Sequence, residues 1–599
     1  MPQPAFLAVI DDIPAVARQL VVCLGRPATI PEMPAGQADR LLVFDNVDAR
    51  ALGAISRLDP RRMAHGLVVV TTRAEHARDP KALLQAQKLL ALLFVKFVEM
   101  PAQSTRVPDP LGLRAQEAPP EYLHLLNRWR NTPLHLRHPL VDKLAAENVG
   151  LPCLLLLPGP SLAVIQNRLP ELARRYLLVT ISRALPYLRA QGVEPDVLVQ
   201  LDTVPMQEHF HHPDERFPNA ALLSLSIAPV HNFAPRFRRT FFIDSFDLAV
   251  LPNPARLRES WTSSLLACLG ALEALGAPQA LLCGADLRVL PDGVYYDDGQ
   301  NAAKAPELPL HHAPLTCKSD VAVLADATGR RAEAPLQFFA AAAEAELFAR
   351  AIGQERGTAF CNLSPLSLLD PEVFAPMDLE KALAAPELDK TPFLEKIDRA
   401  AAKAEQIDLP ALRERCGADL AQAEHGRDLF TCLRVADPGA LAQHPCHAYV
   451  SANVPWFRPT GAEGVARCAG NLADELCAAA RFARNVAALY CRAAKGEALP
   501  VLVTAEEEAK VLAALAAMQP GWTWRAIGLR TLAGGRAEPS GGAVDLTALD
   551  GWLRRQDALL LAPGCAREFR YVLSLLGGSN ILPVEDLLAY RPLCEPQAS

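Results

Sequence analysis

Polar residues follow an apolar run in the middle of the chain, at the point where the run would end as a strand. The run CLLLL, 153–157, is followed by Pro158, Gly159, Pro160 and Ser161. Glycine permits a tight turn and a close backbone approach to a ligand, and Pro160 lacks the N–H that a first helical turn leaves unused. Ser161 suits a helix start, where unpaired amides favour a phosphate. A strand followed by a capped helix explains the same residues without a ligand.

Further polar groups close the next apolar runs or open helical patterns. They are Ser182, Asp202, Thr262, Ser263, Gly284 and Asp286. Asp202 ends VLVQLD, where a carboxylate can accept hydrogen bonds from a ribose, a base or a loop amide. Asp196, which precedes that run, is expected to fix the turn instead. The hydroxyls at 262 and 263 exceed what one helix cap requires, so one can contact a phosphate or hydroxyl.

Histidines and tyrosines follow the last of these groups and are candidates for proton transfer. His311 and His312 lie in LPLHHAP, after Tyr295 and Tyr296. Histidine titrates near working pH and suits a general base. Adjacent residues on an extended segment face opposite ways, so one of the two histidines is expected to serve. Tyr296 or its neighbour is expected to donate a hydrogen bond to a phosphate.

A histidine group earlier in the chain has the composition of a metal cluster. His209, His211 and His212 lie in QEHFHHPDE, without helical i,i+4 spacing and without a recognisable fourth ligand. Zinc sites in proteins use ordered sets of ligands at characteristic spacings. We therefore expect a surface loop here and assign no metal to the chain.

The elements that must position these groups alternate between strands and helices over residues 150–375. Strands are expected in CLLLLPG, YLLVTIS, PDVLVQLD, ALLSLSI, TFFIDS and QALLCGAD, with helices near 162–175 and 263–277. In open parallel sheets, ligands bind outside the carboxyl ends of the strands. The candidate groups are expected to meet at that edge.

Residues 1–100 show the same alternation on a smaller scale. Strands are expected in AFLAVID, RLLVFDN and GLVVVTT, with helices near 13–24, 47–57 and 80–97. The pattern predicts a small, mostly parallel sheet without a Gly-rich phosphate loop. Residues 101–149 are rich in Pro, Arg and His and are expected to connect the units, with one helical piece in PEYLHLLNRWRN.

The C-terminal third begins with helices and returns to α/β. Residues 380–497 are Ala-rich and helix-periodic, broken by a Pro-rich stretch near 433–462. Residues 498–599 contain the apolar runs PVLVTA, TWRAIGL and ALLLAPG, with helices expected from Glu506, near 545–556 and at the end. The fold class is therefore α/β and multidomain, with a central Rossmann-like parallel sheet between smaller units.

Composition and charge exclude several classes of protein. The chain has 599 residues and a net charge of −7, which argues against a dedicated nucleic-acid binder. Arg236, Arg238 and Arg239 form a local basic group, which we interpret as a solvated loop rather than a binding patch. The 14 cysteines contain no C-x-x-C, so neither a zinc ribbon nor a disulfide framework is expected. These features favour a cytoplasmic protein with reduced thiols.

No secretory signal or membrane span is expected from the sequence. The N-terminus, MPQPAFLAVIDDIP, lacks a basic start followed by a long apolar core. The most membrane-like run, LLALLFVKFV from Leu89, is too short to span a bilayer and carries Lys96. That run is expected to form a buried helix.

The ordered set GPSL, PDVLVQLD and TSSLLACLGALEALGAPQALLCGADL resembles the central domain of the motility accessory factors (Maf), which are flagellin glycosyltransferases. It is also similar to the wider MptE-like family, which includes 6-hydroxymethylpterin diphosphokinases. More distantly, it resembles bacterial sialyltransferases that use CMP-sialic acid. The resemblance covers about 150–375. In Maf proteins, N-terminal and C-terminal domains likewise flank the central domain. Leu157 stands where the family usually has the first Gly of G-x-G-P-S-L.

The resemblance implies transfer of a nonulosonic acid, of pseudaminic or legionaminic type, from a CMP donor to Ser or Thr hydroxyls of flagellin. Carried over by motif, the residues expected around the cytidine and phosphate are Gly159, Pro160, Ser161, Ser182, Asp202, Thr262, Ser263, Gly284, Asp286 and Tyr296. No separate cofactor is implied. Two alternatives stay open: a pterin diphosphokinase that uses ATP and Mg²⁺, held by carboxylates such as Asp202 and Asp286, and an inactive flagellin-binding accessory factor.

Overall fold

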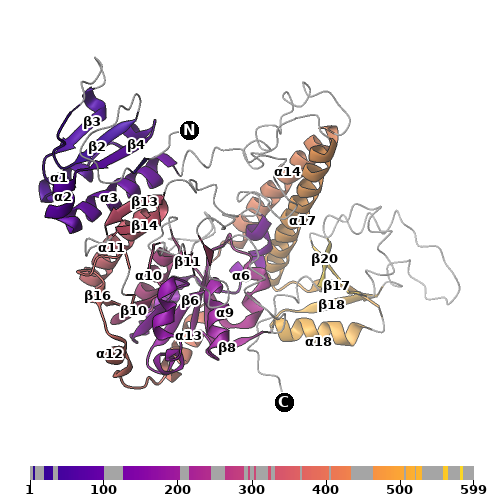
Figure 1. The fold of residues 1–599 in the computed structure, drawn as a ribbon. Coiled ribbons are helices and arrows are strands. Elements are labelled where there is room, and N and C mark those ends of the chain that lie inside the picture. The colour runs from indigo at the N-terminus through magenta and orange to yellow at the C-terminus, as the bar shows by residue number, and fades with distance from the viewer. Residues whose placement is uncertain are drawn as a thin grey trace, which may run out of the picture.

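The computed structural model of the chain describes most of its residues. The described ranges are 5–6, 19–30, 38–99, 126–202, 215–243, 263–288, 294–296, 303–304, 321–325, 331–364, 367–403, 407–433, 463–504, 507–519, 521–528, 558–563 and 581–584. Three parallel sheets, two short antiparallel pairs and the helices that join and cover them make up these ranges, which confirms the α/β class and the multidomain organisation (Figure 1).

The largest sheet has eight strands, every neighbouring pair of which is parallel. Its spatial order is β16-β15-β10-β5-β6-β7-β8-β9. The strands are β5 (Cys153–Leu156), β6 (Leu177–Ile181), β7 (Val197–Gln200), β8 (Phe217–Ser224), β9 (Phe237–Phe242), β10 (Gln279–Cys283), β15 (Ala359–Asn362) and β16 (Ala375–Pro376). The six central strands expected from the sequence are all present. The last two strands, β15 and β16, were not predicted from the sequence.

Both faces of this sheet are buried under helices, as a doubly wound sheet requires. Alternate residues of one strand, such as Cys153 and Leu155 against Leu154 and Leu156, enter two separate apolar clusters. The first face is covered by α7 (Val141–Glu147), α10 (Ser264–Ala274), α11 (Leu336–Arg356) and α13 (Thr391–Ala401). The second is covered by η4 (Pro160–Ile165), α8 (Leu169–Ala173), α9 (Leu185–Ala190) and α12 (Leu379–Leu383).

The helix expected near 162–175 is wrong as one continuous element. The chain forms the short 3-10 helix η4, turns, and restarts as α8. Pro170 lies in the first turn of α8, where its missing N–H costs nothing. Within a continuous helix, its ring would clash with the carbonyl of Gln166. The expected helix near 263–277 is confirmed as α10.

The N-terminal sheet has four parallel strands in the order β1-β4-β2-β3. They are β1 (Ala5–Phe6), β2 (Leu20–Leu24), β3 (Leu41–Phe44) and β4 (Leu67–Thr71), with helices α1 (Ala49–Ile55), α2 (Arg73–Arg78) and α3 (Pro80–Phe94). The helix expected near 13–24 is wrong at its C-terminal end. The run LVVCL is a central strand buried on both faces, and such a run carries no period that separates strand from helix. The expected helices near 47–57 and 80–97 are confirmed.

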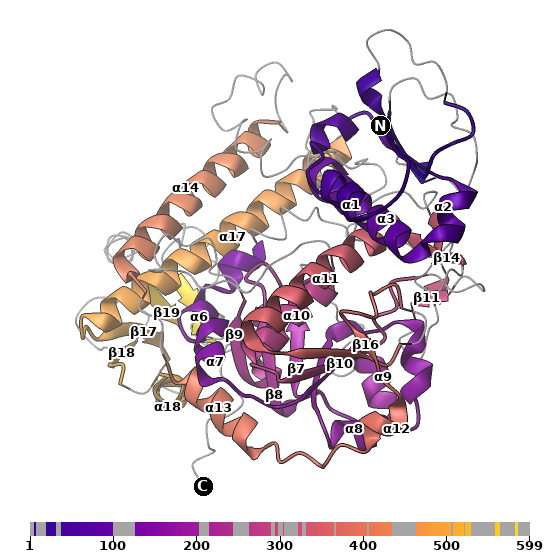
Figure 2. The ribbon, with the colours of Figure 1, turned by 90° about the vertical axis from the view of Figure 1, so that its left-hand side faces the viewer.

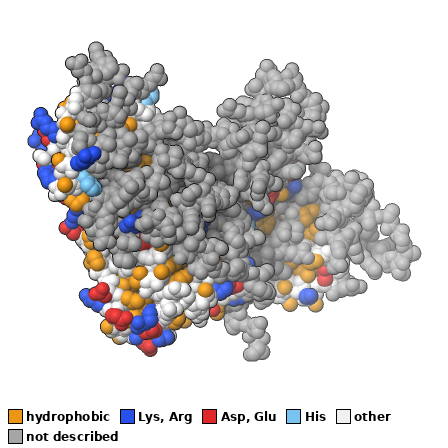
Figure 3. All heavy atoms as spheres, in the orientation of Figure 1, with side chains coloured by type: hydrophobic (Ala, Val, Ile, Leu, Met, Phe, Trp, Pro, Cys, Tyr) orange, Lys and Arg blue, Asp and Glu red, His pale blue; other side chains and the backbone are white. Residues whose placement is uncertain are grey.

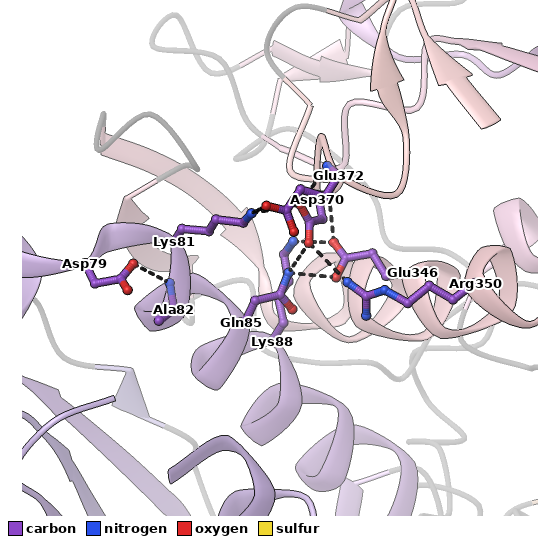
Figure 4. Close-up of polar contacts among 9 residues, drawn as sticks. All are labelled: Asp79, Lys81, Ala82, Gln85, Lys88, Glu346, Arg350, Asp370 and Glu372. Atoms are coloured by element: carbon purple, nitrogen blue, oxygen red, sulfur yellow. Dashed lines mark hydrogen bonds and ion pairs between the residues drawn. The ribbon is translucent and has the colours of Figure 1, made fainter. Parts of the chain in front are cut away.

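The N-terminal unit packs on the central one through α3 and α11. Lys88 of α3 and Glu346 of α11 are fully buried and form an ion pair of 2.5 Å (Figure 4). Gln85 donates to both Glu346 Oε2 and Asp370 Oδ2, each at 3.1 Å. Arg350 pairs with Asp370 at 3.1 Å, and Lys81 pairs with Glu372. This cluster, with the apolar core around it, joins the two units, and it confirms that the run from Leu89 lies in a buried helix.

The C-terminal part consists of two long helices and a third parallel sheet. Helices α14 (Leu409–Leu433) and α17 (Glu463–Ala494) run side by side (Figures 1 and 2). The sheet order is β18-β17-β19-β20, with strands β17 (Leu499–Val503), β18 (Trp524–Gly528), β19 (Leu559–Leu561) and β20 (Ile581–Pro583) and with α18 (Glu508–Met518). The helix expected from Glu506 is α18. The Pro-rich break and the last two expected helices lie outside the described residues.

The basic group at 236–239 forms neither the solvated loop expected from the sequence nor a binding patch. Arg238 and Arg239 lie in β9, and both guanidinium groups pair with the carboxylate of Asp398 in α13, at 2.6 and 2.8 Å. Elsewhere, acidic and basic side chains are mixed along the lower edge of the face seen in Figure 3. Among the described helices, none combines the length and apolar character that crossing a bilayer requires.

Candidate functional site

The central sheet reverses its direction of growth between β5 and β10. The chain runs from β5 outward through β6, β7, β8 and β9, then returns to place β10 on the other side of β5. In doubly wound sheets, ligands bind in the crevice outside the carboxyl ends of the strands at this switch point. The loops that follow β5 and β10 carry Gly159, Ser161, Gly284 and Asp286. The topology therefore brings these predicted residues together at one place.

These loops are held together by a buried hydrogen-bond cluster. The Ser161 N–H donates to Asp286 Oδ2 at 2.8 Å, and the Gly284 N–H donates to Ser161 Oγ at 3.1 Å. Ser364, which follows β15, places its Oγ 2.6 Å from Ser161 Oγ and accepts the Gly284 N–H at 3.2 Å. We call Ser161, Gly284, Asp286 and Ser364 the switch-point cluster. It links three adjacent strand ends.

Glycine is required at both loops by close backbone approach. A Cβ on Gly284 would overlap the carbonyl oxygen of Leu157, and the residue has a φ of +76°. A Cβ on Gly159 would overlap the Gly284 carbonyl oxygen and the Asp286 carboxylate. Leu287, three residues after Gly284, also has a positive φ, of +53°. A bulky residue in this region is uncommon, and such strain is concentrated at functional sites.

The anion position at the first loop is taken by a carboxylate of the chain itself. Pro160 begins η4 and Gly159 is its N-cap, so Ser161 lies in the first turn and is not the cap. Its amide, which a phosphate could otherwise accept from, donates to Asp286. Asp286 is 2% exposed, and burial raises the pKa of its carboxyl. A ligand at this point therefore meets a closed cluster of hydrogen bonds. Contacts of Ser161 and Asp286 with the nucleotide of a sugar donor stay a prediction.

Three other predicted residues, Ser182, Asp202 and Ser263, lie at the same edge of the sheet and differ in exposure and hydrogen bonding. Ser182 follows β6 and is buried at the start of the 3-10 helix Ser182–Ala184. Asp202 is exposed two residues after β7. Ser263 is the N-cap of α10, and its Oγ accepts the Leu265 N–H at 3.1 Å. Thr262, His311 and His312 lie outside the described residues, and of Tyr296 only its place in β11 (Val294–Tyr296) is described.

Two residues at this edge were missed in the sequence. Ser364 completes the switch-point cluster, and its N–H donates to Asn362 Oδ1 at 2.9 Å. The signal was the short apolar run AFC, 359–361, which is followed by Asn362 and Ser364 as the other strands are followed by polar residues. Gln200, at the end of β7, is 1% exposed, and its Oε1 has no hydrogen-bond partner among the described residues. It is a buried acceptor beside the exposed Asp202.

Asp196 has the structural role that its sequence position predicts. It lies before β7, at the opposite edge of the sheet, and its Oδ2 accepts the Leu178 N–H at 2.7 Å. Lys390 Nζ lies 2.5 Å from the same oxygen. The carboxylate thus joins the starts of β6 and β7 to the segment before α13.

Metal ligands do not gather among the described side chains, where no group of three or more His, Cys, Asp or Glu residues could hold an ion. The histidines at 209, 211 and 212 lie outside those residues. The cysteines whose side chains the structure describes are free and buried: Cys23, Cys153, Cys268, Cys283, Cys361, Cys416, Cys477 and Cys491.

The serine pair of the switch-point cluster can be tested by a double-mutant cycle. Ser161→Ala and Ser364→Ala each remove one of two hydroxyls. The two hydroxyls hydrogen-bond to each other, and both accept the Gly284 N–H. We expect a coupling free energy of roughly 0.5–3 kcal/mol, as for contacting residues in one network. Additive losses in urea unfolding would contradict the shared hydrogen bond.

Three histidines lie where the segment 131–138 meets the loop after β8: His135 is buried, and His138 and His231 are half-buried. Burial holds the pKa of His135 well below its usual value and lowers the pKa of His138 and of His231 to about 3, with nearby arginines adding to the effect. Asn131 donates through Nδ2 to the carbonyls of Ser226 and Ala228, so its Oδ1 accepts from His231 Nδ1 at 3.1 Å. All three imidazoles are therefore neutral in the folded protein at neutral pH.

This arrangement predicts a loss of stability in acid. Below pH 6.5 the unfolded chain binds protons on these imidazoles and the folded chain does not, so stability falls as pH falls toward 3. Each histidine contributes up to about 1.4 kcal/mol per pH unit in that window. Thermal unfolding between pH 7.5 and 5 measures the slope. His231→Gln should reduce it and His65→Gln, at an exposed position, should leave it unchanged. Equal slopes in all three proteins would contradict the assignment.

Comparison with known proteins adds a distant likeness. No family model matches the chain, and no curated protein matches it. Among solved structures, the chain is similar to the MAf glycosyltransferase from Magnetospirillum magneticum AMB-1. The identity is 14% and the TM-score 0.34, and the match covers 79% of this chain and 79% of that chain. A likeness of this size carries no argument about the site.

Proposed function

We propose that the chain is a glycosyltransferase that moves a nonulosonic acid from a CMP donor to Ser or Thr hydroxyls of flagellin. The observation that supports this proposal most is the switch point between β5 and β10. There the parallel sheet brings together the loops of GPSL and GAD, which carry the resemblance to the Maf family. The same topology is compatible with other nucleotide ligands, so the choice of CMP rests on the motifs.

In this reaction the acceptor hydroxyl oxygen attacks the anomeric carbon of the sugar, and the bond to the CMP phosphate breaks. The hydroxyl proton passes to a base, for which His311 and His312 are the candidates. The departing phosphate gains negative charge and is stabilised by preorganised donors, such as the hydroxyl of Tyr296 and the amides that begin α10. The Oε1 of Gln200, which has no hydrogen-bond partner among the described residues, is an available acceptor for a ribose hydroxyl or a base amino group.

Nucleotide selectivity tests the proposal. Thermal unfolding of the full chain is measured with CMP, with ATP and Mg²⁺, and with GTP. A ligand at a hundred times its Kd stabilises the folded state by about 2.7 kcal/mol. Stabilisation by CMP alone is expected. Stabilisation by ATP with Mg²⁺ instead would favour a pterin diphosphokinase and overturn the proposal.

One observation favours a second candidate, a flagellin-binding factor without transferase activity. The amide of the first loop donates to Asp286 rather than being left for a phosphate. A chain of this kind would bind flagellin and show no stabilisation by any of the three nucleotides.

A further inference from the structure

A cavity of about 620 Å³ lies between α14 and α17, where α14 begins and α17 ends. Its walls include Leu409, Arg413 and Gly417 from α14 and Arg484, Cys491 and Ala494 from α17. None of the residues that line it belongs to the central sheet or to the loops of the switch-point cluster. Its volume lies within the usual range for pockets that hold small organic molecules.

The cavity exists because small residues face each other across the two helices. Nothing lies within 4 Å of the position that a Cβ on Gly417 would take. On α17, Cys491 and Ala494 present short side chains to the same space. Residues 410, 413, 414 and 417 are spaced at three and four, so they form one face of α14. A larger residue at 417 would fill the gap.

Charge is arranged unevenly around the cavity. Arg413 and Arg484 are half-buried, whereas the acidic residues Asp408 and Glu414 are exposed. Asp408 is also engaged as a helix cap, since its Oδ1 accepts the Ala411 N–H at 3.1 Å. Arg484 donates from Nη1 to the neutral Asn485 Oδ1 at 2.9 Å. Guanidinium groups from both helices line the cavity, and such groups match carboxylate, sulfonate and phosphate groups in geometry.

We propose that this cavity binds a small organic anion with an apolar body. The apolar part packs on the walls formed by Leu409, Cys491 and Ala494, and the acidic group is held by Arg413 and Arg484. The site is independent of the proposed transferase reaction, because it uses other elements of the fold.

The test uses two fluorescent probes of the same shape with the full-length chain. 8-Anilinonaphthalene-1-sulfonate carries an acidic group, and N-phenyl-1-naphthylamine lacks it. Gly417→Leu fills the cavity, and leucine is a better helix former than glycine, so the helix is retained. Gly53→Leu, on α1, is the matched control, because a Cβ on that helical glycine would meet only the end of the Arg57 side chain, at 3.8 Å. We expect Gly417→Leu to weaken binding of both probes more than tenfold, with no change in Gly53→Leu.

A charge variant tests the choice of an anion. Arg484→Met retains the apolar stem and removes the guanidinium group. We expect it to weaken the sulfonate probe about tenfold and to change the neutral probe less than twofold, with Arg413→Met acting in the same direction. Sulfonate binding that survives Gly417→Leu would overturn the site. Equal effects of Arg484→Met on both probes would overturn the anion assignment.

Discussion

Replacing Gly284 by alanine is expected to lower the free energy of unfolding of the central sheet by roughly 2–5 kcal/mol. Two costs add at this position. The φ of +76° lies in the left-handed region, which costs a non-glycine residue about 1–2 kcal/mol. The new Cβ would also overlap the Leu157 carbonyl oxygen, and overpacking of this kind costs about 1–3 kcal/mol. Moving the loops apart would break the Gly284 N–H bonds to Ser161 and Ser364.

Gly192→Ala is the matched control for this change. Gly192 has a φ of +64°, and nothing lies within 4 Å of its Cβ position. It therefore bears the backbone cost of about 1–2 kcal/mol without the overlap. Hydrogen exchange measured on peptides from β5 and β10 compares the two variants. Equal losses of protection would show that the close approach between the loops contributes nothing.

Replacing Lys88 by methionine is expected to destabilise the junction of α3 with α11 by about 3–5 kcal/mol. Lys88 and Glu346 are 0% and 1% exposed, so the change leaves a carboxylate buried without its cation. Removing one partner of a buried ion pair is strongly destabilising for that reason. Glu346 also accepts the Asp370 N–H at 2.9 Å and the Gln85 amide (Figure 4). The loss should spread to the segment that follows β15.

A second variant separates the buried charge from the lost contact. Lys88→Met combined with Glu346→Gln removes both charges and retains an amide oxygen for the Asp370 N–H, so much of the lost stability should return. Lys403→Met is the surface control: Lys403 is 45% exposed, and its partner Glu147 keeps Arg399. That change should cost less than about 1 kcal/mol. Protection of α3 and α11 peptides against hydrogen exchange measures all three. A single Lys88→Met variant as stable as the double variant would contradict the account.

Local patterns in the sequence predicted six of the eight strands of the central sheet and several of the polar groups at their ends. Apolar runs such as YLLVTIS and QALLCGAD end on Ser182 and on Gly284 with Asp286, and the structure places both at the carboxyl edge. The same reasoning failed for Leu20–Leu24, because a fully buried strand and a buried helix share a continuous apolar run.

Partners that lie far apart along the chain were beyond such patterns. Ser161 and Ser364 are 203 residues apart, and Lys88 and Glu346 are 258 apart. Nothing near Ser161 indicates that its amide donates to a carboxylate from another loop. Tertiary packing selects these pairs, so the closed form of the switch-point cluster emerged from the structure alone.

The most direct test of the proposed transfer is the mass of flagellin from cells that carry this gene and from cells that lack it. We expect flagellin from cells with the gene to be heavier by whole nonulosonic acid residues, attached to Ser or Thr. Restoring the gene should restore the added mass. Flagellin of identical mass in both kinds of cell would contradict the proposed function.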